Sequence, residues 1–354
     1  MNFPEKSVGE VFLYENSWNF RRPFAHARGL LTVPTAEQVY IQVSESGLRD
    51  LSWLNKIPDA ALASLDFSHV DGGDEILPKL QSHRSLRSLN LSGLALTDAG
   101  LKFLSGFRHL EMLNLSETDI SGVGLTEICP VSYLYLQRLH LTDTGVLALK
   151  RVKRLDSLAI GWNRLTPSQL DTIASLNGLK RLFIPDCGLS DSQVAKLLRT
   201  MYLAELDLRG NAVGTATLRR LASMKGLNSL NLSRTQIKDS DLSLLGKIRG
   251  LMGLSLSKCA LSSASAAHLA ALSELRLLDL SETDIDDKAV IEIAKLKKLD
   301  KLYLVSSKIS NRSVPLLCKM KTLTELGISN TKVDAKMLAA LKVALPHCTV
   351  TGPD

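Results

Sequence analysis

Residues 275–298 read LRLLDLSETDIDDKAVIEIAKLKK, and this pattern recurs along most of the chain with a period of about 24 residues. Residues 278–280 alternate apolar, polar and apolar, which is the side-chain period of a β-strand. Val290, Ile293 and Leu296 then recur at every third position, as the apolar side of a helix or a 3₁₀ segment does. The repeated unit is therefore predicted to be one short strand followed by one short helix.

A unit of this size cannot bury its apolar side chains alone, so it must stack on copies of itself. Its pattern, L-x-x-L-x-L-x-x-T-x-I-x-D, resembles the leucine-rich repeat family over roughly residues 62–347. The form LALTDAGL at residues 94–101 is similar to bacterial repeats of this length with the motif T-x-I-x-D-x-G-L. The expected fold is α/β, a right-handed leucine-rich repeat solenoid shaped as a horseshoe or arc. Because helices are wider than strands, a parallel β-sheet should line the concave face and short helices the convex face.

Three segments are expected along the chain. Residues 1–61 do not fit the repeat and are predicted to form a β-rich cap, since the first repeat would otherwise expose an apolar cross-section. Residues 62–347 should hold about 12 repeats, and residues 348–354 should add an edge strand and a polar tail. Within the cap, residues 30–33 and 39–43 are predicted to pair as a hairpin. Four aromatic residues are interpreted as filling the cap rather than as a ligand site: Trp18, Phe20, Phe24 and Trp53.

One repeat is short, because the leucine pattern that begins at Leu110 is followed early by the next. Starting the next strand pattern at Leu136 would delete a turn, whereas starting it at Val131 preserves every later repeat. Pro130 ends the preceding helix early, and a loss at a helix end is easier to accommodate than a loss from the strand ladder. We therefore place this strand within residues 131–136.

A turn residue is expected three positions after the last leucine of each strand. In the leucine-rich repeat family this position usually holds Asn, whose side chain bonds to the neighbouring turn backbone. Here it holds mostly polar or small residues: Leu94, Thr118, Leu139, Asn163, Cys187, Asn211, Thr235, Cys259, Thr283, Ser307 and Thr331. We therefore interpret the two cysteines as structural. Three residues further on come residues that favour helix N-caps: Thr97, Ser121, Thr142, Thr166, Ser190, Ser262, Asp286, Ser310 and Asp334.

Charge and cysteine usage narrow the class of protein. The net charge of +7 over 354 residues permits an acidic partner without requiring one. The five cysteines lie far apart with no C-x-x-C pair, which argues against a disulfide framework or a zinc cluster. Residues 1–10 lack a secretory pattern, and no apolar run approaches the roughly 20 residues that cross a bilayer. We expect a cytoplasmic monomer that does not cross a membrane, with secretion as an effector left open.

No catalytic motif is evident. The seven histidines have no phased Cys or Ser partner, and the sequence contains no H-E-x-x-H, nucleophile elbow or phosphate loop. We expect no enzymatic activity, no cofactor and no bound metal.

The strands between residues 131 and 208 differ from the others, which present small or polar side chains such as Asn90 and Asn231 on the concave face. Tyr, Trp and Arg are common at binding hot spots, and adjacent aromatics serve no folding purpose on a solvated face. The predicted partner-binding residues are Tyr133, Tyr135, Arg138, Trp162, Arg181, Phe183, Asp186, Asp207 and Arg209. Two alternatives remain open: the aromatics cover the short repeat and its turn, and the charged residues only pair with each other across strands.

The favoured function is a non-catalytic interaction module that binds a protein or peptide on its concave face. The alternative is a nucleic-acid or polyanion binder that uses cations where each helix returns to a strand: Arg108, Lys153, Lys225, Arg249, Lys297 and Lys321. This alternative is disfavoured, because there is no Lys/Arg run and these cations also complement helix C-termini. Similarity to the repeats of F-box proteins and of bacterial effectors adds a substrate receptor for ubiquitin ligases or a host-directed effector. A spacer without any partner on its inner face also remains open.

Overall fold

The computed structural model describes residues 1–14, 21–33 and 37–352, and the chain forms two compact units, Met1–Gly178 and Leu179–Asp354. We call them unit 1 and unit 2 and describe each by itself. The boundary between them falls inside the segment predicted as the solenoid. The predicted segment boundaries at residues 61 and 347 therefore stay a prediction.

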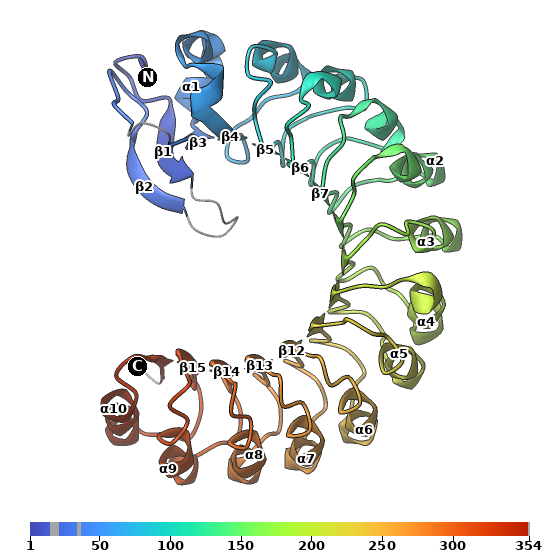
Figure 1. The fold of residues 1–354 in the computed structure, drawn as a ribbon, viewed down its shortest axis with the longest axis vertical. Helices are drawn as coiled ribbons and strands as arrows, with labels where there is room; N and C mark the ends of the chain where they lie inside the picture. Colours follow the sequence, from blue (N-terminus) through green and yellow to red (C-terminus); the bar gives the residue numbers. More distant parts are fainter. Residues whose placement is uncertain (15–20, 34–36, 353–354) are drawn as a thin grey trace. The chain divides into compact units, whose positions relative to one another are not determined.

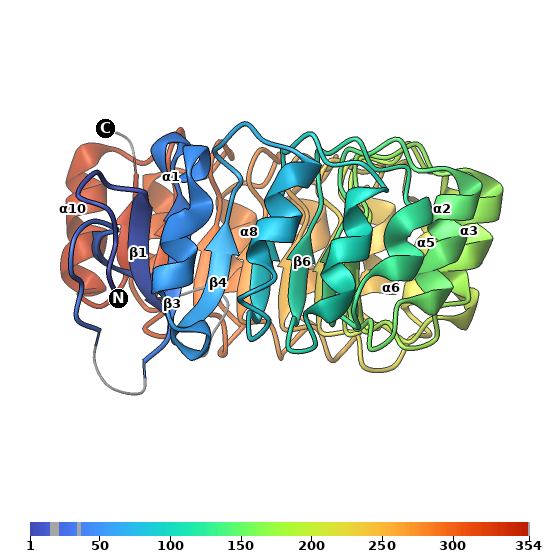
Figure 2. The same cartoon turned by 90° about the horizontal axis from the view of Figure 1, so that it is seen from above.

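Unit 1 contains eight strands and a layer of short helices. Its strands are β1 (Gly9–Tyr14), β2 (Arg21–His26), β3 (Val39–Val43), β4 (Leu62–Asp66), β5 (Ser88–Asn90), β6 (Met112–Asn114), β7 (Tyr133–Tyr135) and β8 (Ser157–Ala159). Its α-helices are α1 (Glu45–Arg49), α2 (Asp143–Ala148) and α3 (Pro167–Ala174). Its 3₁₀ helices are η1 (Leu51–Lys56), η2 (Asp59–Ala61), η3 (Asp74–Leu80), η4 (Gly100–Gly106), η5 (Val123–Glu127) and η6 (Leu149–Arg151). From β3 onward the strands pair in parallel in chain order (Figure 2).

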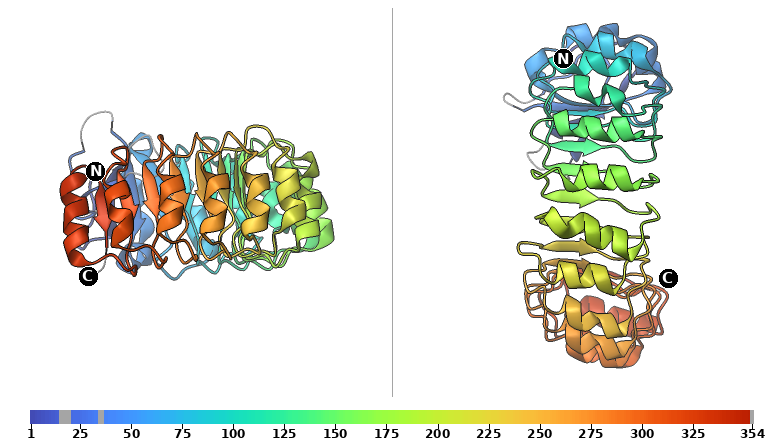
Figure 3. Two further views of the ribbon diagram at one scale, coloured as in Figure 1. Left: turned by 90° about the horizontal axis from the view of Figure 1, so that it is seen from below. Right: turned by 90° about the vertical axis from the view of Figure 1, so that its right-hand side faces the viewer.

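Unit 2 repeats the same arrangement without a cap. Its strands are β9 (Arg181–Phe183), β10 (Glu205–Asp207), β11 (Ser229–Asn231), β12 (Gly253–Ser255), β13 (Leu277–Asp279), β14 (Lys301–Tyr303), β15 (Glu325–Gly327) and β16 (Thr349–Thr351). Its α-helices are α4 (Asp191–Leu197), α5 (Thr215–Leu221), α6 (Leu242–Leu245), α7 (Ala266–Leu269), α8 (Asp287–Ile293), α9 (Val314–Leu317) and α10 (Ala335–Ala344). Four short 3₁₀ helices accompany them: η7 (Leu198–Thr200), η8 (Asp239–Asp241), η9 (Ser263–Ser265) and η10 (Asn311–Ser313). The helices stack side by side along one surface (Figure 3).

The core of each unit lies between its sheet and its helices. The central leucine of each repeat strand is in register with the central leucine of the next, as Leu254, Leu278 and Leu302 illustrate in unit 2. These three side chains are fully buried. In each unit the strands lie on the inner side of the curve and the helices on its outer side (Figure 1). The predicted α/β solenoid, with parallel strands inside and short helices outside, is confirmed within each unit.

The strand of the short repeat lies where the sequence predicted it. Leu134 of β7 is in register with Leu113 of β6 and with Leu158 of β8. The lost residues fall on the helical side, where η5 ends before Pro130. The parallel pairing of the strands is thus preserved, and the helical segment of this repeat is shortened instead.

The N-terminal segment is built differently from the prediction. The hairpin between residues 30–33 and 39–43 is wrong, because β3 pairs antiparallel with β1 and parallel with β4, while Leu30 bridges to Asn2. This segment has no repeat period that would fix its strand partners. Of the four aromatics expected to fill the cap, Trp53 is buried and donates to the Gly47 carbonyl oxygen at 2.9 Å, and Phe24 is 37% exposed. The other two, Trp18 and Phe20, lie outside the described residues.

Candidate partner-binding surface

Each strand from β5 to β15 is followed by a turn that holds one residue in the left-handed backbone region. In unit 1 this position is taken by Gly93, Glu117, Arg138 and Trp162, with φ of 81°, 60°, 53° and 54°. Left-handed φ is uncommon for a bulky side chain and is easiest for glycine. The turn itself is required by the fold, but the backbone gives no reason for a tryptophan at this position.

Four predicted residues of unit 1 lie on two adjacent repeats. Tyr133 and Tyr135 are two residues apart on β7, so both half-buried side chains point to the solvent side of the sheet. Arg138 and Trp162 lie in the turns after β7 and β8 rather than on the strands. The Arg138 guanidinium carbon lies 5.3 Å from the centre of the Trp162 ring, which is within cation–π range, and Trp162 remains 36% exposed. We call these four residues the aromatic patch.

A carboxylate extends this patch along the turns. Arg138 Nη1 lies 3.3 Å from Oε1 of Glu117, which occupies the same turn position one repeat earlier. Both side chains are more than half exposed, so the pair adds little to stability. It holds the guanidinium beside the indole, and sequence analysis missed Glu117, although it occupies the same turn position as Arg138 and Trp162.

The strands of the aromatic patch also lack a structural residue that earlier strands carry. On β4, β5 and β6 the last residue is Asp66, Asn90 or Asn114, and its side-chain oxygen accepts the backbone N–H two residues later at 2.8, 3.2 and 3.0 Å. On β7 and β8 this position holds Tyr135 and Ala159, which cannot do so. The residue that makes this turn contact is therefore absent on β7 and β8, as it also is on β12, which ends in Ser255, and on β15, which ends in Gly327.

In unit 2 the predicted residues are held by ion pairs. Arg181 of β9 is in register with Glu205 of β10, and its Nε lies 3.3 Å from Glu205 Oε1. Phe183 is half-buried and in register with Asp207. The cross-strand pairing that sequence analysis left open therefore occurs at Arg181, with Glu205 as a partner.

A second ion pair spans two repeats. Asp186, Gly210 and Arg234 occupy the left-handed turn position of three successive repeats. Arg234 Nη2 lies 2.6 Å from Asp186 Oδ2, across Gly210. A Cβ at Gly210 would come within 2.0 Å of Asp186 Oδ1, so this glycine leaves the space in which the pair forms. Sequence analysis missed Arg234, because the repeat period aligns its position with Asp186 but does not say which repeats interact.

Asp207 is buried rather than presented to solvent. It is 8% exposed, and its Oδ1 accepts the Arg209 backbone N–H at 2.9 Å, as the equivalent Asn231 does for Ser233. Burial raises the pKa of the Asp207 carboxyl above its usual range, against the opposing effect of the Arg209 N–H and guanidinium. Arg209 Nη2 lies 3.2 Å from Asp207 Oδ2. The structure thus gives Asp207 a turn-forming role and places Arg209 in the turn after β10.

Unit 2 presents a further aromatic that sequence analysis missed. Tyr303 lies on β14, donates its hydroxyl hydrogen to Glu325 of β15, and is half-buried. Burial, followed by the nearby Glu325 carboxylate, raises the pKa of Tyr303 to about 12. Lys301 Nζ lies 2.5 Å from Glu325 Oε1. The strand face of unit 2 therefore carries charges that are largely neutralised within the chain.

The predicted basic residues where helix returns to strand are all exposed. They lie in unit 1 (Arg108 and Lys153) and in unit 2 (Lys225, Arg249, Lys297 and Lys321). Within the described parts of the chain, none has a carboxylate within ion-pair distance. These cations differ in this respect from the arginines of the strand faces.

Cys259, one of the two cysteines at the turn position, has the contacts of a structural residue. Cys259 is buried, and its thiol lies 3.1 Å from the Leu232 carbonyl oxygen. Burial raises the pKa of the Cys259 thiol, and it raises that of Cys129 to about 11. Both thiols therefore stay protonated near neutral pH, where a reactive thiolate would be needed for nucleophilic chemistry.

Among residues 1–14, 21–33 and 37–352, no three His, Cys, Asp or Glu side chains are grouped so that they could hold a metal ion. No helix in these same ranges has both the length and the apolar character of a membrane span.

Comparisons with known proteins identify the repeat. A family model described as Leucine Rich repeat matches residues 82–105 and 108–129. The structure is similar to a crystal structure of an internalin from Listeria monocytogenes, with a TM-score of 0.55 and 20% identity, over 90% of this chain and 86% of that one. It also matches a crystal structure titled PEPR1–AtPEP1, with a TM-score of 0.41 and 18% identity, over 90% of this chain and 47% of that one. No curated protein sequence matches. At 20% identity the internalin structure establishes the fold alone.

Proposed function

We propose that the chain, which has a leucine-rich repeat fold and matches the family model at residues 82–105 and 108–129, is a non-catalytic interaction module that binds a partner protein or peptide on the strand face. The helices cover only the other face of each sheet. Parallel sheets are normally covered on both faces, so an open one leaves a surface available to a partner. The proposal is carried by one observation, the partly exposed Trp162 indole with the Arg138 guanidinium beside it.

The aromatic patch has the chemistry of a binding hot spot. Its tyrosines and tryptophan offer large rigid surfaces at a low cost in side-chain entropy, and its arginine is already positioned by Glu117. In unit 2 we propose Arg181, Phe183, Asp186 and Arg209 as a second set of contacts, while the buried Asp207 pairs with the Arg209 guanidinium. The ion pairs of this set orient its polar groups, and Phe183 supplies its apolar surface.

The test is affinity capture of partners from the native cell with the full chain as bait. Replacing Tyr133 and Trp162 by Ala should weaken binding of the main captured protein by about 2 kcal/mol or more. The contacts in unit 2 are tested separately with Phe183→Ala. Circular dichroism and thermal unfolding should show that each variant remains folded.

The matched control is Tyr202→Ala, since Tyr202 is 80% exposed and lies away from the strands, just after η7. It removes an exposed aromatic of unit 2 without touching the strand face. If the aromatic-patch variant captures the same partners in the same amounts as the wild type, the proposed site is wrong. If the Tyr202 variant loses them equally, binding depends on general surface apolarity.

A further inference from the structure

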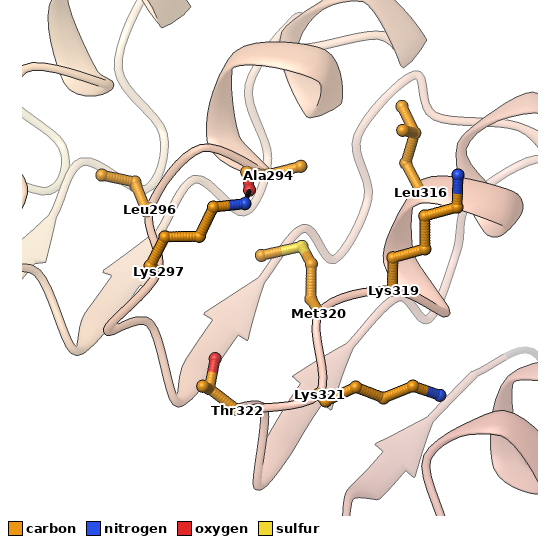
Figure 4. A pocket seen from close by; sticks show the side chains of 8 residues that line it. All are labelled: Ala294, Leu296, Lys297, Leu316, Lys319, Met320, Lys321 and Thr322. Carbon is orange, nitrogen blue, oxygen red and sulfur yellow. Dashed lines mark hydrogen bonds between the residues drawn. The ribbon is translucent and has the colours of Figure 1, made fainter.

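A groove opens on the helical side of unit 2, where α8 and α9 end and the chain returns to β14 and β15. Its volume is about 310 Å³. The side chains that the argument uses are Leu296, Lys297, Leu316, Lys319, Met320 and Lys321, all shown in Figure 4. The groove lies wholly within unit 2 and does not include any residue of the proposed strand-face site.

The floor of this groove is aliphatic. Leu296 and Met320 are 2% and 6% exposed, and Leu316 is half-buried. The Met320 side chain lies between Lys297 and Lys319 in the view of Figure 4. Methionine is flexible and polarisable, so it adapts to apolar side chains of different shapes. The floor therefore suits one aliphatic side chain of a ligand.

The rim of the groove is basic, and its charges are not neutralised. Three exposed lysines line it and no carboxylate does. Lys297 Nζ donates to the Ala294 carbonyl oxygen at 3.1 Å and Lys321 Nζ to the Ala344 carbonyl oxygen at 2.8 Å, so both contact uncharged groups. Among the described residues, none of the three has a carboxylate within ion-pair distance.

Other lysines of unit 2 provide the contrast. Five lysines each lie within 3.1 Å of a carboxylate oxygen: Lys258, Lys295, Lys298, Lys301 and Lys308. Acidic side chains are thus available to neighbouring lysines of this unit, yet they do not reach the groove. The groove keeps three positive charges around an apolar floor.

We propose that this groove binds an acidic peptide segment of a partner protein, with an aliphatic side chain on the floor and flanking carboxylates at the three lysines. An extended peptide with acidic residues beside a leucine or isoleucine matches both features together. A nucleic acid matches only the charge, because its bases stack on aromatic or arginine side chains and the groove is lined by neither. This surface adds to the strand-face site and does not depend on it.

The test measures binding of a short fluorescein-labelled peptide, with one leucine flanked by glutamates, to the full chain by fluorescence anisotropy. Replacing Lys297, Lys319 and Lys321 by Gln should weaken binding about tenfold, since three exposed charge pairs each contribute a modest amount. Affinity should also fall as salt rises. A peptide with serine in place of the leucine, at the same charge, should bind more weakly to the wild type.

The matched control is a variant with Lys288, Lys332 and Lys336 replaced by Gln. It removes the same charge from exposed positions of unit 2 at the beginnings of α8 and α10 or in the turn before α10, whereas the groove is formed where α8 and α9 end. We expect this control to bind the peptide like the wild type. Equal weakening by both triple variants would overturn the groove and leave only general electrostatic attraction.

Three further outcomes test which ligand the groove binds and whether it acts independently of the strand-face site. No binding of the leucine peptide by the wild type would overturn the proposal. Tighter binding of single-stranded DNA, lost in the groove variant, would replace the peptide with a polyanion. Unchanged peptide binding by the variant with Tyr133 and Trp162 replaced by Ala is expected, and it separates failure of the strand-face site from failure of the groove.

Discussion

Each repeat of unit 2 has two connections, and their side chains do different things. On the strand-to-helix side, turn residues bond to the backbone: Thr235, Thr283, Ser307 and Thr331 each donate to the carbonyl oxygen three residues earlier at 2.6–2.7 Å. Asp191, Asp239 and Asp287 accept N–H or O–H groups from the next repeat. The polar side chains named here all have a structural partner.

The helix-to-strand side is less completely paired, although Lys298 forms an ion pair with Glu274 there. Lys225 and Arg249 are exposed and have no carboxylate partner among the described residues, and Tyr202 and Met252 are 80% and 43% exposed. The fold requires only that apolar residues such as Leu227 and Leu251 be buried there. The side chains of the strand-to-helix connection therefore stabilise the fold. Those of the helix-to-strand connection are available for contacts outside the chain.

The largest expected effect concerns Asn211, which is 2% exposed. Its Nδ2 donates to the carbonyl oxygens of Leu208 and Ile184, and its Oδ1 accepts the N–H groups of Cys187 and Leu189. Asn211→Ala should lower the free energy of unfolding by about 3 kcal/mol, because these backbone groups lose their partner in a buried turn. Urea denaturation followed by circular dichroism measures it.

Thr283→Val is the matched control for this prediction. It keeps the side-chain shape and removes one hydrogen bond, from Thr283 Oγ1 to the Leu280 carbonyl oxygen, so a loss of about 1 kcal/mol is expected. If Asn211→Ala lowers the free energy of unfolding no more than Thr283→Val does, the strand-to-helix connection stabilises the fold less than we propose.

Much of this connection follows from the sequence. The capping box at Thr166 is present, with Gln169 N–H donating to Thr166 Oγ1 at 3.2 Å and Gln169 Oε1 accepting the Thr166 N–H at 3.1 Å. Ser190 forms a second one with Gln193. These contacts are local, so residue type and spacing suffice to predict them.

Contacts between repeats were harder to predict. The Asp186–Arg234 pair joins residues of two non-adjacent repeats, and it forms only because Gly210 between them has no side chain. The period aligns all three positions, but it does not say which repeats interact. Likewise, burial of Asp207 depends on its role in the turn, which the sequence alone does not distinguish from a solvent-facing carboxylate.

A smaller effect is expected at Asp191, which caps the next helix from outside. The N-cap of α5 is Gly214, which has no side chain, and Asp191 accepts the N–H groups of Gly214, Ala216 and Thr217 at 2.8–2.9 Å instead. Asp191→Asn should lower the free energy of unfolding by about 1 kcal/mol near neutral pH, the usual size of a lost helix cap, because the amide accepts fewer bonds.

The stabilisation by the Asp191 carboxylate should depend on pH in a definite direction. Burial raises the pKa of Asp191, but hydrogen bonds from Thr217, Gly214 and Ala216 outweigh it, and the net pKa lies below its usual value of 3.8. The carboxylate therefore stabilises the fold fully above that value, and its contribution is lost as the pH falls through the lower folded-state pKa. Wild type and Asp191→Asn should thus converge in acid. A gap that stays constant from neutral to strongly acidic pH would contradict the capping role.

The smallest effect on the free energy of unfolding is expected at the helix-to-strand lysines. This prediction tests the difference between the two connections most directly. Lys297→Gln and Lys321→Gln each remove an exposed ammonium whose only assigned contact is a backbone carbonyl oxygen, Ala294 or Ala344. The free energy of unfolding should change by less than about 0.5 kcal/mol, as for ordinary surface substitutions. The same urea series used for Asn211 measures this. A loss of about 1 kcal/mol or more, the size expected for a lost helix cap, would mean that these lysines complement helix C-termini as structural residues. The groove would then resemble the turns on the other side of the repeat, and its basic rim would no longer point to an acidic partner.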